Sequence, residues 1–287
     1  TAQESLEESL ALFESAGAAD SDDARVLQSH AEALAAHGDN DLAAEALKRA
    51  TDLTPEAPEI WLALAQNLIV LGPSRNDDAL EAIRAVLSLE PAQPIATEAH
   101  LLLAGIYRRT SLYDFALEEY EQVLALDPEN LAARMGKAIL GIRTGGVVEA
   151  SRTFDELGAI PPELSTPAND MLEAMLRDFS ELRVWLPDDA EHHLAYAKLL
   201  IRVSMLQESV APLVRVTQLA PDNYVAYNFL GFVRGALGAV DEAIEAYEAS
   251  LRINPGQPRT REIIESLKNP PKQPAPSEPA GAQTGQT

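Results

Sequence analysis

The chain has 287 residues, 46% of them hydrophobic and 5% aromatic, and its 45 acidic against 22 basic residues give a net charge of −23. So negative a protein repels phosphate backbones and anionic lipid head groups, which argues against nucleic acid or a membrane surface as its partner. It contains no cysteine, which excludes disulfides, thiolate sites and structural zinc fingers and leaves the redox compartment open.

Prolines punctuate the chain at a nearly fixed interval, and each ends a stretch of helical apolar periodicity. Seven of them are separated by 36, 37, 34, 25, 34 and 34 residues: Pro55, Pro91, Pro128, Pro162, Pro187, Pro221 and Pro255. A period of this length indicates repeats that bury their apolar faces only by stacking on one another. We therefore expect a helical solenoid, and with it a binding surface.

The residues before the first repeat are predicted to form an amphipathic helix over 3–17. Leu6, Leu10 and Phe13 fall on one face of it, and Phe13 stands where the second helix of a repeat carries its aromatic residue. We expect residues 1–23 to act as an N-terminal capping helix or half repeat.

Residues 24–162 contain four repeats, each predicted to be two amphipathic helices joined by a short turn. Small residues such as Ala65, Ala104 and Ala138 let the two backbones approach closely. The first helix is expected to stop at a glycine, which takes the left-handed conformation without a side-chain clash: Gly38, Gly72, Gly145 and, in the last repeat, Gly238.

Residues 163–189 are too few for two helices and a turn, so we expect one linking helix there. Ser165 or Thr166 is predicted to cap it, with Pro167 in its first turn. Its apolar residues form one stripe at helical spacing: Met171, Leu172, Met175, Leu176, Phe179 and Leu182. A packing helix is the simpler interpretation, and a methionine-rich helix that binds a partner is the alternative.

Residues 190–257 contain two more repeats. The fifth is aligned on Tyr196, Ala197, Leu200, Ala211, Leu213 and Val216, and the sixth on Tyr227, Leu230, Gly231, Ala243, Tyr247 and Ser250. A C-terminal capping helix is expected over residues 258–268. The proline-rich tail at 269–287 cannot form a core, and we interpret it as a disordered tether rather than a polyproline ligand.

The order of residues within a repeat resembles the tetratricopeptide repeat family: an aromatic residue, Leu-Gly or Leu-Ala, a tyrosine, an alanine, a second aromatic, an alanine and a final proline. The resemblance covers residues 24–257 apart from the interruption at 163–187. It implies an all-α, right-handed superhelical solenoid of helix-turn-helix hairpins. It also implies that a concave groove, lined by the first helix of each repeat, binds a peptide or helix of another protein.

Carried over position by position, the resemblance predicts a partner-binding groove in which apolar residues alternate with cations. Its residues are Leu101, Arg108, Arg109, Met135, Ile139, Arg143, Leu194, Lys198, Arg202, Asn228 and Phe232. Such a groove suits a segment with hydrophobic anchors and acidic flanks. The alternative is that these cations pair with local carboxylates, as Arg108 would with Glu118 or Glu119.

Some members of the family bind the tails of chaperones by gripping a C-terminal carboxylate with lysine, asparagine and arginine. The corresponding positions here hold Gln28, Glu32, Ala63, Glu98 and Leu102. This clamp is therefore absent, which argues against a chaperone tail as the ligand.

Catalytic residues, cofactors and metal sites are not predicted. His30 and His100 occupy framework positions of first helices and are expected to pack. His192 and His193 are adjacent, so on a helix they diverge by about 100°, and no third ligand follows at helical spacing. The resemblance likewise implies no inherited catalytic chemistry, so we do not expect an enzyme.

The sequence thus predicts a non-catalytic scaffold or adaptor that acts in complex assembly through protein partners. Three alternatives stay open: a permanent structural subunit of a larger, even membrane-associated, complex; a binding module of a longer enzyme or secretion protein; and self-association through the terminal repeats. Thr1 in place of an initiator Met suggests a processed or trimmed chain. On this basis we favour the bacterial periplasm, with the cytoplasm as the alternative.

Overall fold

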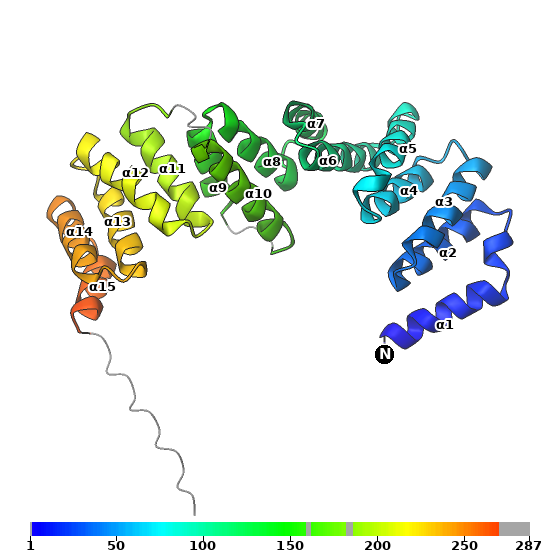
Figure 1. Cartoon of the computed structure of the whole chain (residues 1–287), viewed down its shortest axis with the longest axis horizontal. Coiled ribbons are helices and arrows are strands. Elements are labelled where there is room, and N and C mark those ends of the chain that lie inside the picture. The colour runs from blue at the N-terminus through cyan, green and yellow to red at the C-terminus, as the bar shows by residue number, and fades with distance from the viewer. Residues whose placement is uncertain (1, 159–161, 182–185, 270–287) are drawn as a thin grey trace, which may run out of the picture. The chain divides into compact units, whose positions relative to one another are not determined.

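The structure is a computed structural model, and it describes residues 2–158, 162–181 and 186–269. Every regular element within these residues is a helix (Figure 1). The chain divides into two compact blocks. Block 1 comprises Thr1–Gly141 and Leu157–Ala168, and block 2 comprises Ile142–Glu156 and Asn169–Thr287. We describe each block by itself.

Block 1 is built from antiparallel helical hairpins. Its helices are α1 (Ala2–Ser15), α2 (Ala24–His37), α3 (Asn40–Leu53), α4 (Pro58–Val70), α5 (Asn76–Ser88), α6 (Gln93–Arg109), α7 (Tyr113–Leu126) and α8 (Leu131–Gly141), with short 3-10 turns at Ala18–Asp20 and Pro73–Arg75. Helix α2 packs on α3, α4 on α5, and α6 on α7, and each second helix also contacts the next first helix. The first helices α4 and α6 touch as well, so they share a surface.

Block 2 repeats this plan. Its helices are α11 (Ala190–Arg202), α12 (Leu206–Leu219), α13 (Tyr224–Ala236), α14 (Val240–Ile253) and α15 (Pro258–Lys268). Helices α11 and α12 form one hairpin and α13 and α14 the next, with α12 against α13 and α14 against α15. Both blocks therefore bury their apolar faces by stacking neighbours, as a repeat architecture requires.

The division between the blocks runs through the fourth repeat and the residues that follow it. Helix α9 (Val147–Leu157) follows a 3-10 turn at Ile142–Thr144, and α10 (Pro162–Glu181) begins earlier than expected. The predicted cap at Ser165 or Thr166 is therefore wrong, and Pro167 lies inside α10. Pro167 is the sixth residue of α10, so it leaves the Glu163 carbonyl without its backbone N–H partner.

The apolar stripe of α10 is buried, from Met171 to Phe179. Leu182, its last predicted member, lies outside the described residues. That α10 links two arrays stays a prediction.

Four of the turns between paired helices share one hydrogen-bond pattern, in which an N–H beyond the helix donates to a carbonyl five residues earlier. The four bonds are Asp39 to Leu34 at 2.9 Å, Leu112 to Tyr107 at 2.8 Å, Met205 to Leu200 at 2.9 Å and Ala239 to Arg234 at 2.9 Å. This pattern needs a left-handed residue just before the donor. Glycine takes that place in two of the turns, but Ser111 (φ 60°) and Ser204 (φ 62°) take it in the other two.

Small residues lie where the paired helices approach most closely. Ala65, Ala104 and Ala197 are fully buried, and a Cβ added at Gly231 would stand 2.9 Å from the ring of Tyr247. The alignment of the fifth repeat on Ala211 is wrong, because Ala211 is exposed and Ser209 is fully buried instead.

Ser209 stands twelve residues before Pro221, as Ala243 stands before Pro255. Its hydroxyl donates to the Leu206 carbonyl at 2.7 Å, which satisfies the buried polar group.

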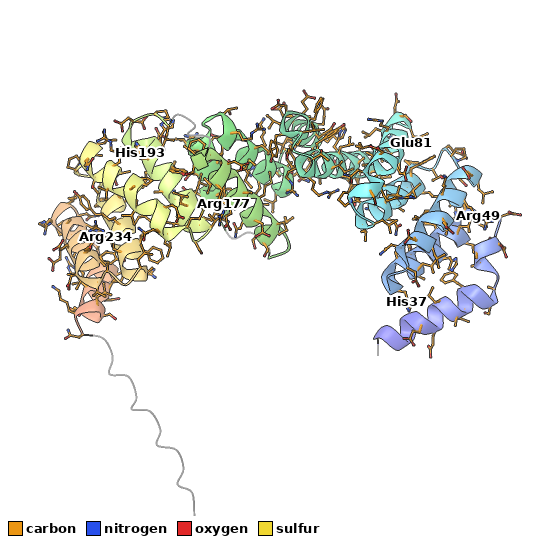
Figure 2. The ribbon with its side chains drawn as sticks, in the orientation of Figure 1. His37, Arg49, Glu81, Arg177, His193 and Arg234 are labelled. Atoms are coloured by element: carbon orange, nitrogen blue, oxygen red, sulfur yellow. The ribbon has the colours of Figure 1, made fainter. Side chains whose placement is uncertain are left out.

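Helices α1 and α15 cover apolar residues of their neighbours. Phe13 of α1 lies 5.6 Å from the ring of His30, between ring centroids, and Arg49, labelled in Figure 2, donates to the carbonyls of Ala19 and Ser21. Ile264 of α15 packs on Tyr247. The capping roles of residues 1–23 and 258–268 remain proposals, and residues 270–287 of the expected tail lie outside the described chain, as does the Leu6 side chain.

Candidate functional site

The predicted groove residues fall into the two blocks. Leu101, Arg108 and Arg109 lie on α6, and Met135 and Ile139 lie on α8, all in block 1. The remaining six, which belong to block 2, are Arg143, Leu194, Lys198, Arg202, Asn228 and Phe232. The two sets are therefore examined separately.

One side of α6 lies at the edge of the block 1 core, against which its residue Leu102 still packs. Leu101, Leu102, Gly105, Arg108 and Arg109 recur at helical spacing on this side, which we call the α6 face. The two leucines are partly buried and Arg109 is exposed. The neighbouring helix α4 adjoins it, because Gln66 donates to Glu98 of α6 at 2.5 Å.

Gly105 leaves an opening in the middle of the α6 face. A Cβ added to it would have no heavy atom within 4 Å beyond its own helix and chain neighbours. The glycine of α8 is different, because a Cβ at Gly136 would overlap the ring of Tyr120. Gly136 is thus a packing residue, whereas the space above Gly105 is not used by the described chain.

Arg108 and Arg109 carry two adjacent positive charges at the end of α6. In the described part of the chain neither forms an ion pair, although acidic residues are close by in sequence. The expected alternative partner Glu119 pairs instead with His100, at 2.6 Å between Nδ1 and Oε2. Burial, together with the charge of Arg108, lowers the pKa of Arg109.

A side-chain hydrogen bond joins Arg108 to the hydroxyl of Tyr120 on α7. Burial raises the pKa of Tyr120, and the nearby guanidinium opposes that shift. Because the same ring packs on Gly136 of α8, the tyrosine connects Arg108 to the hairpin behind it.

The two arginines are not needed to cap the end of α6. The last carbonyls of the helix accept hydrogen bonds from the backbone N–H groups of Thr110, Ser111 and Leu112. The Thr110 hydroxyl adds bonds to the Ile106 and Tyr107 carbonyls, at 3.0 and 3.1 Å. Helix-end capping is the common structural role of a C-terminal arginine, and here other groups fill it.

Met135 and Ile139 are placed differently from the α6 residues. They are 3% and 0% exposed, so they contribute to the packing of the chain itself. The chaperone-clamp positions also hold internal contacts, since Gln28 donates to Glu32 at 3.2 Å.

The predicted cations of block 2 are already occupied. Lys198 of α11 pairs with Asp155 of α9, and the guanidinium carbon of Arg202 lies 4.4 Å from the centre of the Phe154 ring, also on α9. Burial lowers the pKa of Arg202, which the charge of Asp155 partly offsets. Arg143, in the 3-10 turn before α9, also has an interaction partner.

Asn228 and Phe232 lie on α13. Asn228 donates to Gln257 at 2.6 Å, and Gln257 in turn donates to the Ser250 and Asn254 carbonyls, at 3.2 and 2.8 Å. Phe232 is 50% exposed, whereas Leu194 of α11 is partly buried. Of the six block 2 residues, Phe232 is the one that presents a large apolar surface to solvent.

A charged cluster at the start of α11 was not predicted from sequence. Asp188 accepts bonds from Arg215 and from His193, labelled in Figure 2, the latter at 3.1 Å. The Arg215 bond, with smaller help from His193, lowers the pKa of Asp188 to about 2. The run of Asp188, Asp189, His192 and His193 was the available signal, but its partner Arg215 lies one helix later.

Two hollows lie away from the α6 face. One of about 270 Å³ is formed by α3, α4 and α5 around Trp61, Lys48 and Glu81, and one of about 660 Å³ opens beside the starts of α2 and α4. In the described residues, no group of three or more His, Asp or Glu side chains is arranged to hold a metal ion.

Comparison with known proteins identifies the repeats. Family models described as tetratricopeptide repeat match residues 24–67, 74–120 and 224–257. Cellulose synthase 1 operon protein C of Komagataeibacter xylinus is 34% identical over 85 residues, which is 30% of this chain and 6% of that protein. The chain thus spans a small fraction of the length of this curated relative.

Two solved structures are similar over most of the chain. A tetratricopeptide repeat protein from Parabacteroides merdae covers 86% of this chain and 99% of its own, with 17% identity and a TM-score of 0.43. YrrB, titled a tetratricopeptide repeat protein with an unusual peptide-binding site, covers 77% of this chain and 99% of its own, with 17% identity and a TM-score of 0.38.

Residues 24–67, 74–120 and 224–257 are thus tetratricopeptide repeats, and the fold of the chain is an all-α solenoid of helical hairpins. Such repeats form scaffolds for protein–protein interaction and are generally non-catalytic. Among the helices that the structure describes, none is both long and apolar enough to cross a membrane.

Proposed function

We propose that this protein is a non-catalytic adaptor that holds a segment of a partner protein on the α6 face of block 1. The observation that carries this proposal is the open surface at Gly105. Partly buried leucines and two arginines without ion pairs in the described chain surround a position where the helix presents bare backbone. A partner segment can approach such a position closely.

The same position in other repeats supports this interpretation. Counting from the small residue of each first helix, Gly105 corresponds to Lys198 in the fifth repeat and to Phe232 in the sixth. Lys198 is paired with Asp155, and Phe232 fills its own position with an aromatic ring. Of these three repeats, the third is the one that leaves the position open.

The experiment is site-specific photo-crosslinking in the native organism. A photoreactive phenylalanine derivative replaces Leu101 on the α6 face or, as a matched control, Glu118 on the exposed side of α7. We expect protein adducts from position 101 and few from position 118. Gly105→Phe, which copies the residue of the sixth repeat, should abolish the adducts at 101 and leave the urea unfolding curve almost unchanged.

The opposite pattern would favour a permanent structural subunit. Leu112 in the turn and Phe115 on α7 are 46% and 52% exposed and lie six and three residues before Glu118. Stoichiometric adducts from 118, with none from 101, would overturn the adaptor proposal and place the interface on the second helices.

A further inference from the structure

The α6 face has a polarity along the helix. Glu98 lies at its beginning, where Gln66 holds its carboxylate, and the two arginines lie at its end. In a chain of net charge −23, the arginine end is a local positive site that the chain's own described carboxylates leave unbalanced. The nearby Glu121 pairs with Lys137 at 2.9 Å, and Glu119 pairs with His100.

We infer that the partner segment is extended and acidic, with an apolar side chain over Leu101 and Leu102 and an Asp or Glu carboxylate on Arg108 and Arg109. This inference rests on the proposed function, because it names the ligand of the same face. Guanidinium groups bind carboxylates through paired, charge-assisted hydrogen bonds. The carboxylate comes from a side chain within the partner, since the positions that grip a chain terminus are occupied by other residues.

The geometry of the face sets the spacing of the motif. Seven residues of helix separate Leu101 from Arg108, which corresponds to about 10 Å along α6. An extended chain in the polyproline II conformation advances about 3.1 Å per residue and returns to the same side at every third residue, so residues i and i+3 both face the helix and cover about 9 Å. The ligand motif is therefore an apolar residue, two residues of any kind, and an acidic residue.

Gly105 is the reason for choosing an extended rather than a helical ligand. With no side chain between the leucines and the arginines, the backbone of the partner can lie against the helix. A helical ligand is about 10 Å wide and keeps its own side chains between the two backbones. A helical ligand would also space its anchors at about seven residues instead of three.

The test uses the full chain and a display library of random 12-residue peptides as the probe. Selection is carried out on the wild type, on Arg108→Glu/Arg109→Glu, and on Arg25→Glu/Arg84→Glu, which changes the net charge equally at exposed positions away from the α6 face. We expect the wild type and the control to enrich peptides with the apolar–x–x–acidic spacing. The reversed variant should lose that motif and prefer a basic residue in the acidic position.

Synthetic peptides then measure how much the acidic residue contributes to binding affinity. For the strongest peptide, changing its acidic residue to the amide should weaken binding roughly tenfold, and 1 M salt should weaken the parent peptide more than the amide. Tyr120→Phe should reduce affinity for the parent peptide several-fold while the ring still packs on Gly136. Because this change keeps the aromatic ring, a lost fold would not explain the result.

Three results would overturn the inference: no enrichment on the wild type, enrichment without an acidic position, or the same acidic motif on the reversed variant. They are distinguishable from failure of the adaptor proposal. If crosslinks form at position 101 but the crosslinked segment is basic or helical, the face binds a partner and only its inferred chemistry is wrong. If no crosslinks form there, the adaptor proposal itself fails.

Discussion

Arg109 in block 1 and Arg202 in block 2 occupy the same position of their repeats, five residues after Ala104 and Ala197 respectively, yet their surroundings differ. Arg202 lies over the ring of Phe154 on α9. The next residue of that helix, Asp155, forms an ion pair with Lys198. Arg109 lies beside a second arginine with no described carboxylate partner. The comparison teaches that a repeat position predicts where a side chain stands, but not whether the chain itself uses it.

The largest effect that sharpens this comparison should come from glycines within block 1. Gly136→Ala forces a methyl group into the ring of Tyr120, and we expect a loss of about 1–3 kcal/mol in the free energy of unfolding. Gly105→Ala should instead stabilise the helix by about 0.5–1 kcal/mol, because nothing opposes the methyl group. Urea unfolding followed by tryptophan fluorescence measures both, and equal effects would show that the α6 face is not open.

The next largest difference in stability is expected between substitutions of the two equivalent arginines, Arg202 and Arg109. Arg202→Gln removes the cation from the Phe154 ring, and the expected cost is about 1 kcal/mol. Arg109→Gln should change stability by less than about 0.5 kcal/mol, since it removes no internal partner and relieves repulsion from Arg108. Urea titrations of both variants decide the matter. A larger loss for Arg109→Gln would mean that this residue is structural.

The smallest effect concerns acid stability in block 2. The pKa of Asp188 in the folded chain is about 2, below its ordinary value of 3.8, so its contribution is complete above that value and is lost as the pH falls from about 4 toward 2. Asp188→Asn should therefore lower the urea midpoint at pH 5 and differ less from the wild type at pH 2.5. A difference that does not depend on pH would contradict this assignment.

Much of the fold could be predicted because the constraints are local. Each terminal proline, buried alanine and glycine turn belongs to a single hairpin. These residues recur with the period of the repeat, so they could be recognised in the sequence. Ser111 and Ser204 were missed because a serine in the left-handed conformation looks like any other turn residue until its backbone is seen. Ser209 could have been found by counting back from Pro221.

The candidate site was less predictable, because its occupancy depends on residues far away in sequence. The sequence around Lys198 does not indicate that it pairs with Asp155, which lies 43 residues earlier. Asn228 is held by Gln257, which lies 29 residues later at the N-cap of α15. The α6 residues, in contrast, were placed by repeat position alone, since no distant element of the described chain covers them.

The role of Gln257 has a consequence for how such an array can be built. This one amide, at the N-cap of α15, joins α13, α14 and the start of α15 by hydrogen bonds. It adds a polar contact beside the apolar packing of Ile264 on Tyr247. For protein engineering, we expect that copies of a repeat inserted ahead of α15 will be tolerated when the last copy keeps the equivalents of Asn228 and Ser250, which bind Gln257.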